Sequence, residues 1–499
     1  MKRIQVALVV CLSAFFMNNV ISQPTLYKEK YRPQFHFSPA LHWTNDPNGL
    51  VYNKGTYHLF YQHNPMANRW GHMSWGHAIS KDLVHWDHLP VAIEEGKDVM
   101  IFSGSCVVDE NNTSGFGKDG KIPMVAIYTG HKHDGSHQSQ HIAYSLDDGL
   151  NWTKYANNPV LDLNKRDFRD PKVFWYEAEK KWVMVVAFPN EKTIEFYSSS
   201  NLKEWKHTGS FGPAADVSGI WECPDMFETP IADQPGKTKW VLMLSPSPYM
   251  QYFVGSFDGT KFVAENDTKK TFRPDYGPDY YAAITYNNLP KGAAPMSIGW
   301  ASNPWYAGDL PTLPWKCAFS MPRRLSVKKF GDEWLLVQKP VENIALLRGE
   351  ATQWQNTTLR GTKSVPLKSQ QFEMDLILDM GNATECAVSV AAGTDHEMKI
   401  GYNSTTNKLF IDRSKTSNQS FHDNFKKFNR YEADLNIASK RLQLHIFFDN
   451  SIVEVFANQG EVVMTAQIFP NAEDKGIELS SNGNSLILAM NLWKMKSAW

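Results

Sequence analysis

The sequence has few cysteines and no excess of charge of either sign. Only five cysteines occur in 499 residues, and four of them are spaced too widely for a CxxC zinc site or a disulfide framework. Lys and Arg number 51 against 52 Asp and Glu, with no long basic run, which argues against nucleic acid or an anionic membrane surface as a partner. We expect the four cysteines to be mostly free and buried: Cys106, Cys223, Cys317 and Cys386.

Long apolar runs are missing except at the N-terminus, so we expect no transmembrane segment. A basic pair at residues 2–3 precedes the apolar stretch Ile4–Phe16, as in a secretory signal peptide. We assign residues 1–22 to this signal peptide and predict secretion to the extracellular space or the periplasm. A lipid anchor at Cys11 is disfavoured because Val10 precedes it, where a lipoprotein signal has a small residue.

Helix-period segments are scarce, whereas short β-rich runs bounded by Gly, Pro, Asn or Asp fill the chain from about residue 50 onward. A degenerate turn-then-aromatic pattern recurs at intervals of about 50 to 70 residues, as expected for propeller blades. The alternative is that this pattern is only a common hairpin. The aromatic residues of the repeat are Trp86, Trp152, Trp205 and Phe262.

We therefore predict an all-β protein of two units. Residues 30–340 have room for about five blades and form the predicted catalytic domain. Residues 341–352 are expected to be a short helix or linker. Alternating strands then predict a β-sandwich over residues 353–499.

Three acidic residues stand in unusual local contexts. Asp46 precedes Pro47 in a segment that reads as a tight turn, although it could be an ordinary solvated turn. Arg169 is expected to lower the pKa of its neighbour Asp170, although the two could form a surface ion pair. Glu222 lies among apolar residues, which are expected to raise its pKa, although an edge strand could expose it. If these residues fall on three inner strands, a propeller brings them into one central pocket.

Three motifs resemble those of glycoside hydrolase family 32, the β-fructofuranosidases that include invertases, inulinases and levanases. They are Trp43–Gly49, with Thr44 where Met is usual, Arg169–Pro171 and Glu222–Cys223. The resemblance implies a five-bladed propeller followed by a β-sandwich, a retaining mechanism, and no cofactor or metal. It also implies roles: Asp46 as nucleophile, Glu222 as acid/base and Asp170 as the carboxylate that holds the fructose hydroxyls.

Further motifs of the same family suggest the walls of the pocket. For Phe102 and Trp300, core packing is the alternative explanation. The residues that the resemblance implies for substrate binding are Asn45, Gln62, Trp70, Phe102, Ser103, Arg169, Asp279 and Trp300.

The expected activity is the release of β-D-fructofuranosyl units from fructans (levan or inulin) and sucrose. Segments 75–82 and 102–116 resemble exo-acting inulinases and levanases more than plant invertases. Four alternatives stay open: an endo-acting levanase, a fructosyltransferase, a non-catalytic fructan-binding protein, and an inverting arabinan- or xylan-cleaving enzyme. Nothing in the sequence indicates a particular oligomeric state.

Four histidines crowd one segment, and such a cluster could in principle bind a metal. Their neighbours are Lys, Gly, Ser and Gln, which is typical of a solvated loop, and the expected chemistry needs no metal. We therefore predict no metal site here. The histidines are His131, His133, His137 and His141.

Overall fold

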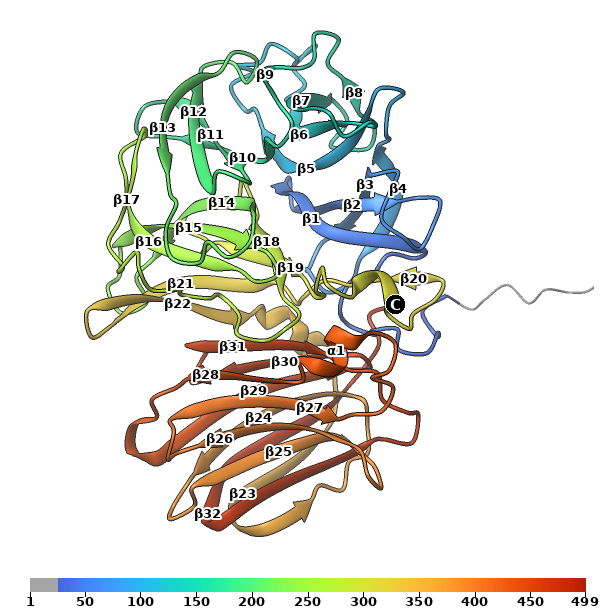
Figure 1. The fold of residues 1–499 in the computed structure, drawn as a ribbon, viewed down its shortest axis with the longest axis vertical. Helices are drawn as coiled ribbons and strands as arrows, with labels where there is room; N and C mark the ends of the chain where they lie inside the picture. Colours follow the sequence, from blue (N-terminus) through green and yellow to red (C-terminus); the bar gives the residue numbers. More distant parts are fainter. Residues whose placement is uncertain (1–25) are drawn as a thin grey trace, which may run out of the picture.

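The computed structural model describes residues 26–499, so the predicted signal peptide and Cys11 lie outside the described residues. Two β-rich bodies are stacked along the long axis of the molecule (Figure 1). The predicted fold class is confirmed: a ring of five sheets is followed by a β-sandwich. Within residues 26–499, no helix is long and apolar enough to cross a membrane.

Each sheet of the ring is an antiparallel blade whose four main strands follow one another in the chain. Blade I consists of β1 (His42–Asn53), β2 (Thr56–Asn64), β3 (Ser74–Ser80) and β4 (Asp87–Ile93), with β20 (Trp315–Lys316) parallel to β1. Blade II consists of β5 (Val99–Val108), β6 (Met124–Lys132), β7 (Gln138–Ser145), β8 (Thr153–Lys154) and β9 (Leu161–Lys165). Blade III consists of β10 (Arg169–Tyr176), β11 (Lys181–Phe188), β12 (Thr193–Ser199) and β13 (Lys206–Phe211).

The ring is completed by two further blades and closed by a bridge between its first and last members. Blade IV consists of β14 (Trp221–Pro230), β15 (Thr238–Pro246), β16 (Gln251–Phe257) and β17 (Phe262–Ala264). Blade V consists of β18 (Tyr281–Thr285), β19 (Met296–Trp300), β21 (Arg323–Phe330) and β22 (Glu333–Pro340), and the 3-10 helix η1 (Ala307–Asp309) follows β19. A parallel bridge between Val51 and Asn287 joins blade I to blade V.

The repeat seen in the sequence marks the same position in four of the five blades. Trp86, Trp152 and Trp205 each immediately precede the fourth strand of their blade, and Phe262 opens the fourth strand of blade IV. The aromatic side chain follows the turn between the third and fourth strands, where the chain reaches the outer edge of the blade. The repeat is therefore a blade signature and not an isolated hairpin pattern.

The second body begins earlier than the sequence suggested. A 3-10 helix, η2 (Glu342–Leu347), follows blade V, and β23 (Arg348–Ser364) starts inside the segment predicted as a linker. The other strands are β24 (Gln371–Asp379), β25 (Glu385–Ala392), β26 (Glu397–Asn403), β27 (Lys408–Lys415), β28 (Arg430–Asp434), β29 (Arg441–Asp449), β30 (Ile452–Ala457), β31 (Val462–Gln467) and β32 (Gly476–Met495). The short helices are α1 (Asp423–Lys427) and η3 (Ala438–Lys440).

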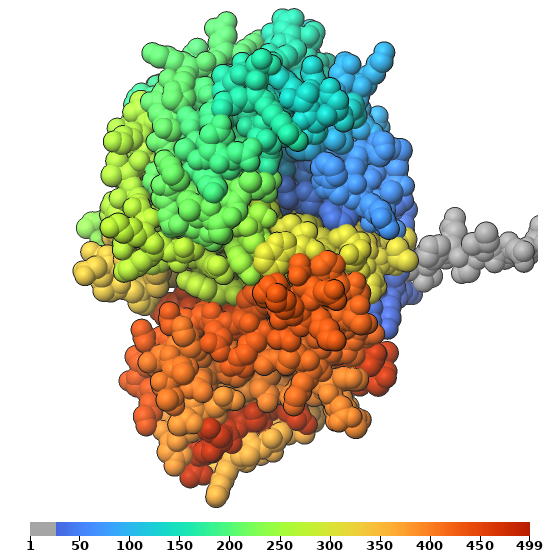
Figure 2. Space-filling view, viewed as in Figure 1, coloured from blue at the N-terminus to red at the C-terminus, as the bar shows by residue number. Residues whose placement is uncertain are grey.

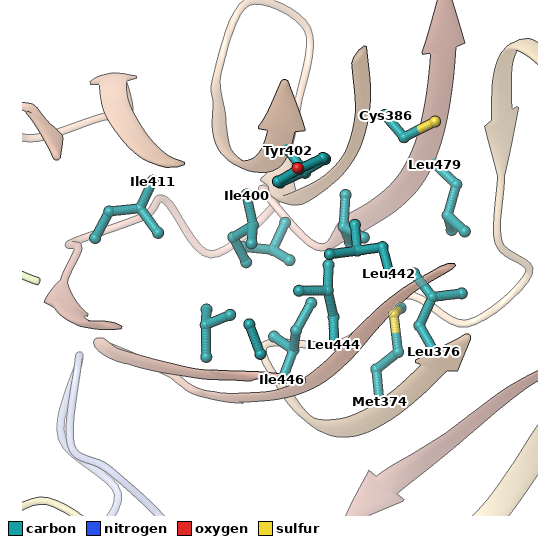
Figure 3. Packing of buried hydrophobic residues seen from close by; sticks show 14 of the residues in the cluster. Met374, Leu376, Cys386, Ile400, Tyr402, Ile411, Leu442, Leu444, Ile446 and Leu479 are labelled. Atoms are coloured by element: carbon teal, nitrogen blue, oxygen red, sulfur yellow. The ribbon is translucent and has the colours of Figure 1, made fainter. Parts of the chain in front are cut away.

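Strand β32 holds the sandwich together. It pairs with β23 along one edge, and its other edge pairs first with β25 and then with β24. The strands alternate buried and more exposed residues, so that every second side chain of β24 and β29 enters the core. Figure 3 shows this core, in which Met374 and Leu376 of β24 lie beside Leu442, Leu444 and Ile446 of the neighbouring strand β29.

A buried polar network joins the two bodies. Arg323 of blade V contacts Glu454 of the sandwich at 2.7 Å and Asp275 at 3.0 Å, and all three side chains are fully buried. The His36 ring lies between Asp449 and Glu454, at 2.9 and 3.0 Å. Burial opposes ionisation, but Arg323 and His36 together lower the pKa of Glu454 to about 2. The propeller and the sandwich therefore share ionised groups as well as apolar surface.

Candidate active site

The innermost strand of every blade is irregular at the same level of the ring. The pairing register shifts between residues 44 and 47 in β1, 101 and 104 in β5, 169 and 172 in β10, 222 and 225 in β14, and 281 and 284 in β18. Such bulges bend a strand and redirect its side chains. Three of the bulged residues have left-handed backbones, with φ of 67° at Asp170, 47° at Cys223 and 51° at Ala282. The bulges direct side chains from all five blades toward the ring axis.

A cavity of about 640 Å³ opens at this level. It is visible in Figure 2 as the hollow whose floor is blue and whose lower rim is formed by the yellow segment near residue 305. The sequence-predicted residues that line it are Asn45, Asp46, Gln62, Trp70, Phe102, Ser103, Arg169, Asp170, Glu222 and Trp300.

Two of the three carboxyl groups meet at the thiol of Cys223. The Cys223 Sγ lies 3.5 Å from Oδ2 of Asp46 and 3.6 Å from Oδ2 of Asp170. Asp46 also accepts a hydrogen bond from the Ser103 hydroxyl at 2.8 Å, and Asp170 accepts one from the Cys223 backbone N–H at 3.0 Å. Burial and the nearby carboxylates raise the pKa of the Cys223 thiol well above its usual value. Cys223 is therefore a neutral donor between the two carboxyl groups.

Glu222 occupies a more polar site than the sequence suggested. Its Oε1 accepts hydrogen bonds from Nε and Nη2 of Arg169, at 3.2 and 3.0 Å, and its Oε2 accepts one from the Tyr281 hydroxyl at 2.7 Å. The apolar neighbours in the sequence do not surround this carboxyl group, because successive side chains of a strand point to opposite sides. Trp221, for example, is fully buried and donates its indole N–H to the backbone oxygen of Asp216.

The expected effect of Arg169 on Asp170 is outweighed by burial. The Arg169 Nε lies 3.9 Å from Asp170 Oδ2 and makes its close contacts with Glu222 instead. Burial, reinforced by the charges of Glu222 and Asp46, raises the pKa of Asp170 to about 7 despite the opposing effect of Arg169. The prediction of a lowered pKa was therefore wrong. Burial and the charge of Glu222 also raise the pKa of Asp46, whereas the hydrogen bond from Ser103 acts to lower it.

Aromatic and amide groups complete the walls. The Phe102 ring stacks on His131 with centroids 4.3 Å apart, and Trp70, which is 53% exposed, meets Phe102 edge-on. The indole N–H of Trp43 donates to Asn45 Oδ1 at 2.8 Å, which fixes the amide beside Asp46. The cavity thus combines flat apolar faces with a few oriented polar groups, as is typical of a ligand site.

The comparisons with known proteins place the chain in a family. Residues 36–340 match "Glycosyl hydrolases family 32 N-terminal domain", and residues 343–494 match "Glycosyl hydrolases family 32 C terminal". The chain belongs to glycoside hydrolase family 32. A levanase from Bacillus subtilis (strain 168) is 44% identical, over 95% of this chain and 72% of the relative. An extracellular exo-inulinase from Aspergillus awamori is 39% identical, over 97% of this chain and 98% of the relative.

Solved family 32 structures share the whole architecture. The crystal structure of the exo-inulinase from Aspergillus awamori superposes with a TM-score of 0.89 and 38% identity, covering 95% of this chain and all of the other. A β-fructofuranosidase from Schwanniomyces occidentalis, complexed with fructosyl-erythritol, gives a TM-score of 0.87 at 32% identity, covering 94% and 99%. The predicted family membership is confirmed, and the chain is a glycosidase.

Asp279 is the one predicted family 32 site residue that does not line the cavity. It is fully buried and accepts hydrogen bonds from the Tyr306 hydroxyl at 2.5 Å, Arg413 Nη1 at 2.9 Å and the Gln467 backbone N–H at 2.7 Å. Arg413 belongs to the sandwich. Asp279 therefore fixes the rim of the cavity to the second body, contrary to the prediction that it contacts substrate.

The histidine cluster is dispersed over blade II. His131 lies in the cavity wall, His133 bonds the Gly96 backbone oxygen, and His137 pairs with Asp162. His141 is packed beneath Gly130, and burial lowers its pKa to about 4. The expectation that it lies in a solvated loop was therefore wrong. Within residues 26–499, no group of three or more His, Cys, Asp or Glu side chains is arranged to hold a metal ion.

Tyr281 and His131 are among the cavity residues that were not predicted. Tyr281 directly follows the Asp279-Tyr280 pair and takes the same bulge position on β18 as Glu222 does on β14. The equivalence of Tyr281 and Glu222 rests on the bulges, which only the structure shows. The sequence places His131 in a solvated loop, whereas the structure places it near the end of β6, paired with Met100 of β5.

The hydrogen bond from Ser103 gives a test of the state of Asp46. In Ser103→Ala, the pKa of Asp46 should rise further, because the variant lacks the hydrogen bond that counteracts the effect of burial on this pKa. If Asp46 must be ionised for activity, as the role of nucleophile predicted from the sequence requires, the acidic limb of the kcat/KM profile should move to higher pH. At the plateau we expect a loss of roughly tenfold, from one hydrogen bond to a charged group. An acidic limb that stays in place would contradict the link between Ser103 and Asp46.

Proposed function

We propose that this family 32 glycosidase releases terminal β-D-fructofuranosyl units from fructans and sucrose by a retaining mechanism. The observation that carries the proposal is the convergence of Asp46, Asp170 and Glu222, from the inner strands of three blades, on one cavity. The similarity to a levanase and to exo-inulinases supports fructans as the substrate class.

In the first step, ionised Asp46 attacks the anomeric carbon of the fructosyl unit. The bond from this carbon to the glycosidic oxygen breaks as Glu222 transfers its proton to that oxygen, leaving a covalent fructosyl–enzyme ester. In the second step, Glu222 removes a proton from water, which attacks the same carbon and releases Asp46. Two displacements at one carbon retain its configuration.

The other polar groups fit supporting roles. Arg169 lies against Glu222 and stabilises its carboxylate after the proton has left. Asp170 is buried beside Cys223, where its oxygens can hold the hydroxyls of the sugar ring. Because burial raises the pKa of Asp170 to about 7, the cluster of Asp46, Asp170 and Glu222 keeps a proton in mildly acidic solution. We assign fructose contacts also to Asn45, Gln62, Trp70 and Ser103, all of which line the cavity.

We further propose that the enzyme is exo-acting and secreted. Side chains from all five blades converge on the floor of the cavity, so the cavity suits a chain end better than the middle of a polymer. The Aspergillus relatives are named as extracellular exo-inulinases, which supports secretion.

A time course of products from sucrose, inulin and levan, separated by chromatography, tests this function. Free fructose alone from the earliest time points is the expected result. A ladder of oligosaccharides would indicate an endo-acting enzyme instead, and trisaccharides growing from sucrose would indicate a fructosyltransferase. Hydrolysis of none of the three substrates would reject the proposal, and arabinan and xylan would be tested next. The Glu222→Ala protein, prepared in parallel, controls for contaminating activity.

A further inference from the structure

Three aromatic side chains gather on the surface beside the cavity. Trp305 meets Tyr249 edge-on, with ring centroids 6.2 Å apart, and lies against Phe428 at 5.2 Å. Tyr249 follows strand β15 of blade IV, Trp305 belongs to the segment after β19 of blade V, and Phe428 follows helix α1 of the sandwich. We call this cluster the aromatic platform. It spans the seam between the two bodies.

The aromatic platform is continuous with the cavity. Pro304 and Ala307–Asp309 line the cavity, and Trp305 lies between them in the chain. In Figure 2 this yellow segment borders the hollow, and the orange surface near α1 adjoins it directly. Trp305 is 38% exposed, so a large indole surface faces solvent next to the cavity mouth. A single exposed aromatic side chain needs no explanation, but one that adjoins a cavity proposed to bind sugar offers an additional surface for the ligand.

The backbone that carries Trp305 is held rigidly from below. The buried Asn303 accepts a hydrogen bond from the Trp305 backbone N–H at 3.0 Å and donates to the Pro278 backbone oxygen at 2.7 Å. The next residue, Tyr306, is tied by its hydroxyl to Asp279 and to Arg413 of the sandwich. Trp305 is therefore preorganised, so a ligand would lose little free energy in ordering it.

The two other rings are also fixed. The Arg273 guanidinium lies 4.2 Å from the centroid of the Tyr249 ring, and the Lys427 ammonium lies 5.2 Å from that of Phe428. Flat, rigid aromatic surface suits the apolar C–H faces of neutral sugars.

We propose that the aromatic platform binds the internal fructosyl units of a fructan chain whose terminal unit occupies the cavity. This inference rests on the proposed function and extends it to longer substrates. A chain leaving the cavity over Pro304 meets Trp305 first, and Tyr249 and Phe428 extend the contact. Sucrose has a single sugar beyond the scissile bond and therefore offers no internal fructosyl unit to this surface. The platform therefore selects polymers over sucrose without contacting the reacting atoms.

Steady-state kinetics of Trp305→Ala on sucrose, inulin and levan test the proposal. We expect kcat/KM for the two polymers to fall by about threefold to tenfold, mainly through KM, which is the range for an aromatic contact. We expect kcat/KM for sucrose to stay within twofold. Trp305→Phe should retain most of the polymer activity, because it keeps a flat ring. Leu150→Ala, which removes a 62% exposed apolar side chain from blade II, is the matched control.

The outcomes separate the platform from the proposed function. Hydrolysis by the unmodified protein tests the function, whereas the ratio between variant and unmodified protein tests the platform. An equal loss on sucrose and polymers, or no loss on any, would overturn the platform. If the unmodified protein hydrolyses nothing, electrophoresis through gels that contain levan decides: slower migration that Trp305→Ala abolishes supports the platform, and equal migration of the two proteins rejects it.

Discussion

Replacing Glu222 or Asp46 by alanine is expected to remove nearly all turnover of sucrose and fructans. Loss of a general acid/base typically lowers the rate by about 10²–10⁴-fold, and loss of the nucleophile prevents the covalent intermediate. Both side chains lie in the cavity, and Glu222 is oriented from two sides by Arg169 and Tyr281. The measurement is kcat and KM on sucrose for each purified variant.

The matched control is Asp167→Asn. Asp167 binds the same guanidinium, at 3.0 Å from Arg169 Nη1, but it does not line the cavity. We expect this variant to keep kcat within about fivefold, since a partly exposed ion pair contributes about 1 kcal/mol or less. A Glu222→Ala protein that kept more than roughly a tenth of the wild-type rate would make the acid/base assignment wrong.

Azide distinguishes the two carboxylates. Azide is a nucleophile that needs no general base. With a fructoside whose leaving group departs without protonation, so that the covalent intermediate still forms in Glu222→Ala, azide should restore turnover of this intermediate and give β-fructosyl azide, with retained configuration. In Asp46→Ala there is no covalent intermediate, and azide can attack only from the face that Asp46 vacates, which gives the inverted product. Detection of the same azide anomer from both variants would contradict the assignment of these roles.

The second large effect is expected at the seam between the bodies. Arg323→Met should lower the free energy of unfolding by about 3–5 kcal/mol, because it leaves Glu454 and Asp275 buried without their cation. The neighbouring Arg324 offers a close control. It pairs with Glu342 at 2.7 Å, but the two side chains are 37% and 71% exposed, so Arg324→Met should cost about 1 kcal/mol or less.

Denaturant unfolding followed by fluorescence, with scanning calorimetry in parallel, measures both variants. A decrease for Arg323→Met no larger than that for Arg324→Met would mean that the buried network does not stabilise the seam. Adding Glu454→Gln and Asp275→Asn to Arg323→Met should recover part of the loss, since the uncompensated charges are then removed. This recovery separates electrostatic from packing effects.

Much of the fold could be predicted because the governing signals are local. Each Trp of the repeat follows a tight turn within its own blade, so a window of a few residues carries the pattern. Asp46, Asp170 and Glu222 could likewise be identified because each lies within a short motif of its own. The convergence of these motifs followed from the ring geometry alone.

The pairing of charges could not be predicted, because it depends on residues that are distant in the sequence. Arg169 adjoins Asp170 in the chain, but the bulge in β10 turns the two side chains apart and directs the guanidinium to Glu222, 53 positions away. Asp279 lies beside cavity residues in sequence, yet its partner Arg413 belongs to the other body, 134 positions away. Proximity in the sequence therefore does not predict the charge partner of a residue where a strand bends or where two bodies meet.

The five bulges of the inner strands have a consequence for how such an enzyme can change. The reacting groups sit on the strands nearest the axis, whereas the loop that carries Trp305 and the outer strands lie beyond them. An insertion in an outer strand or its turn alters the spacing between motifs but leaves the reacting groups where they are. On the proposed assignments, the residues that carry the chemistry and those that set the substrate range therefore lie on separate parts of the chain. We expect relatives to differ in their preference for sucrose or long polymers through changes in the segments at the rim of the cavity, while the reacting residues stay the same.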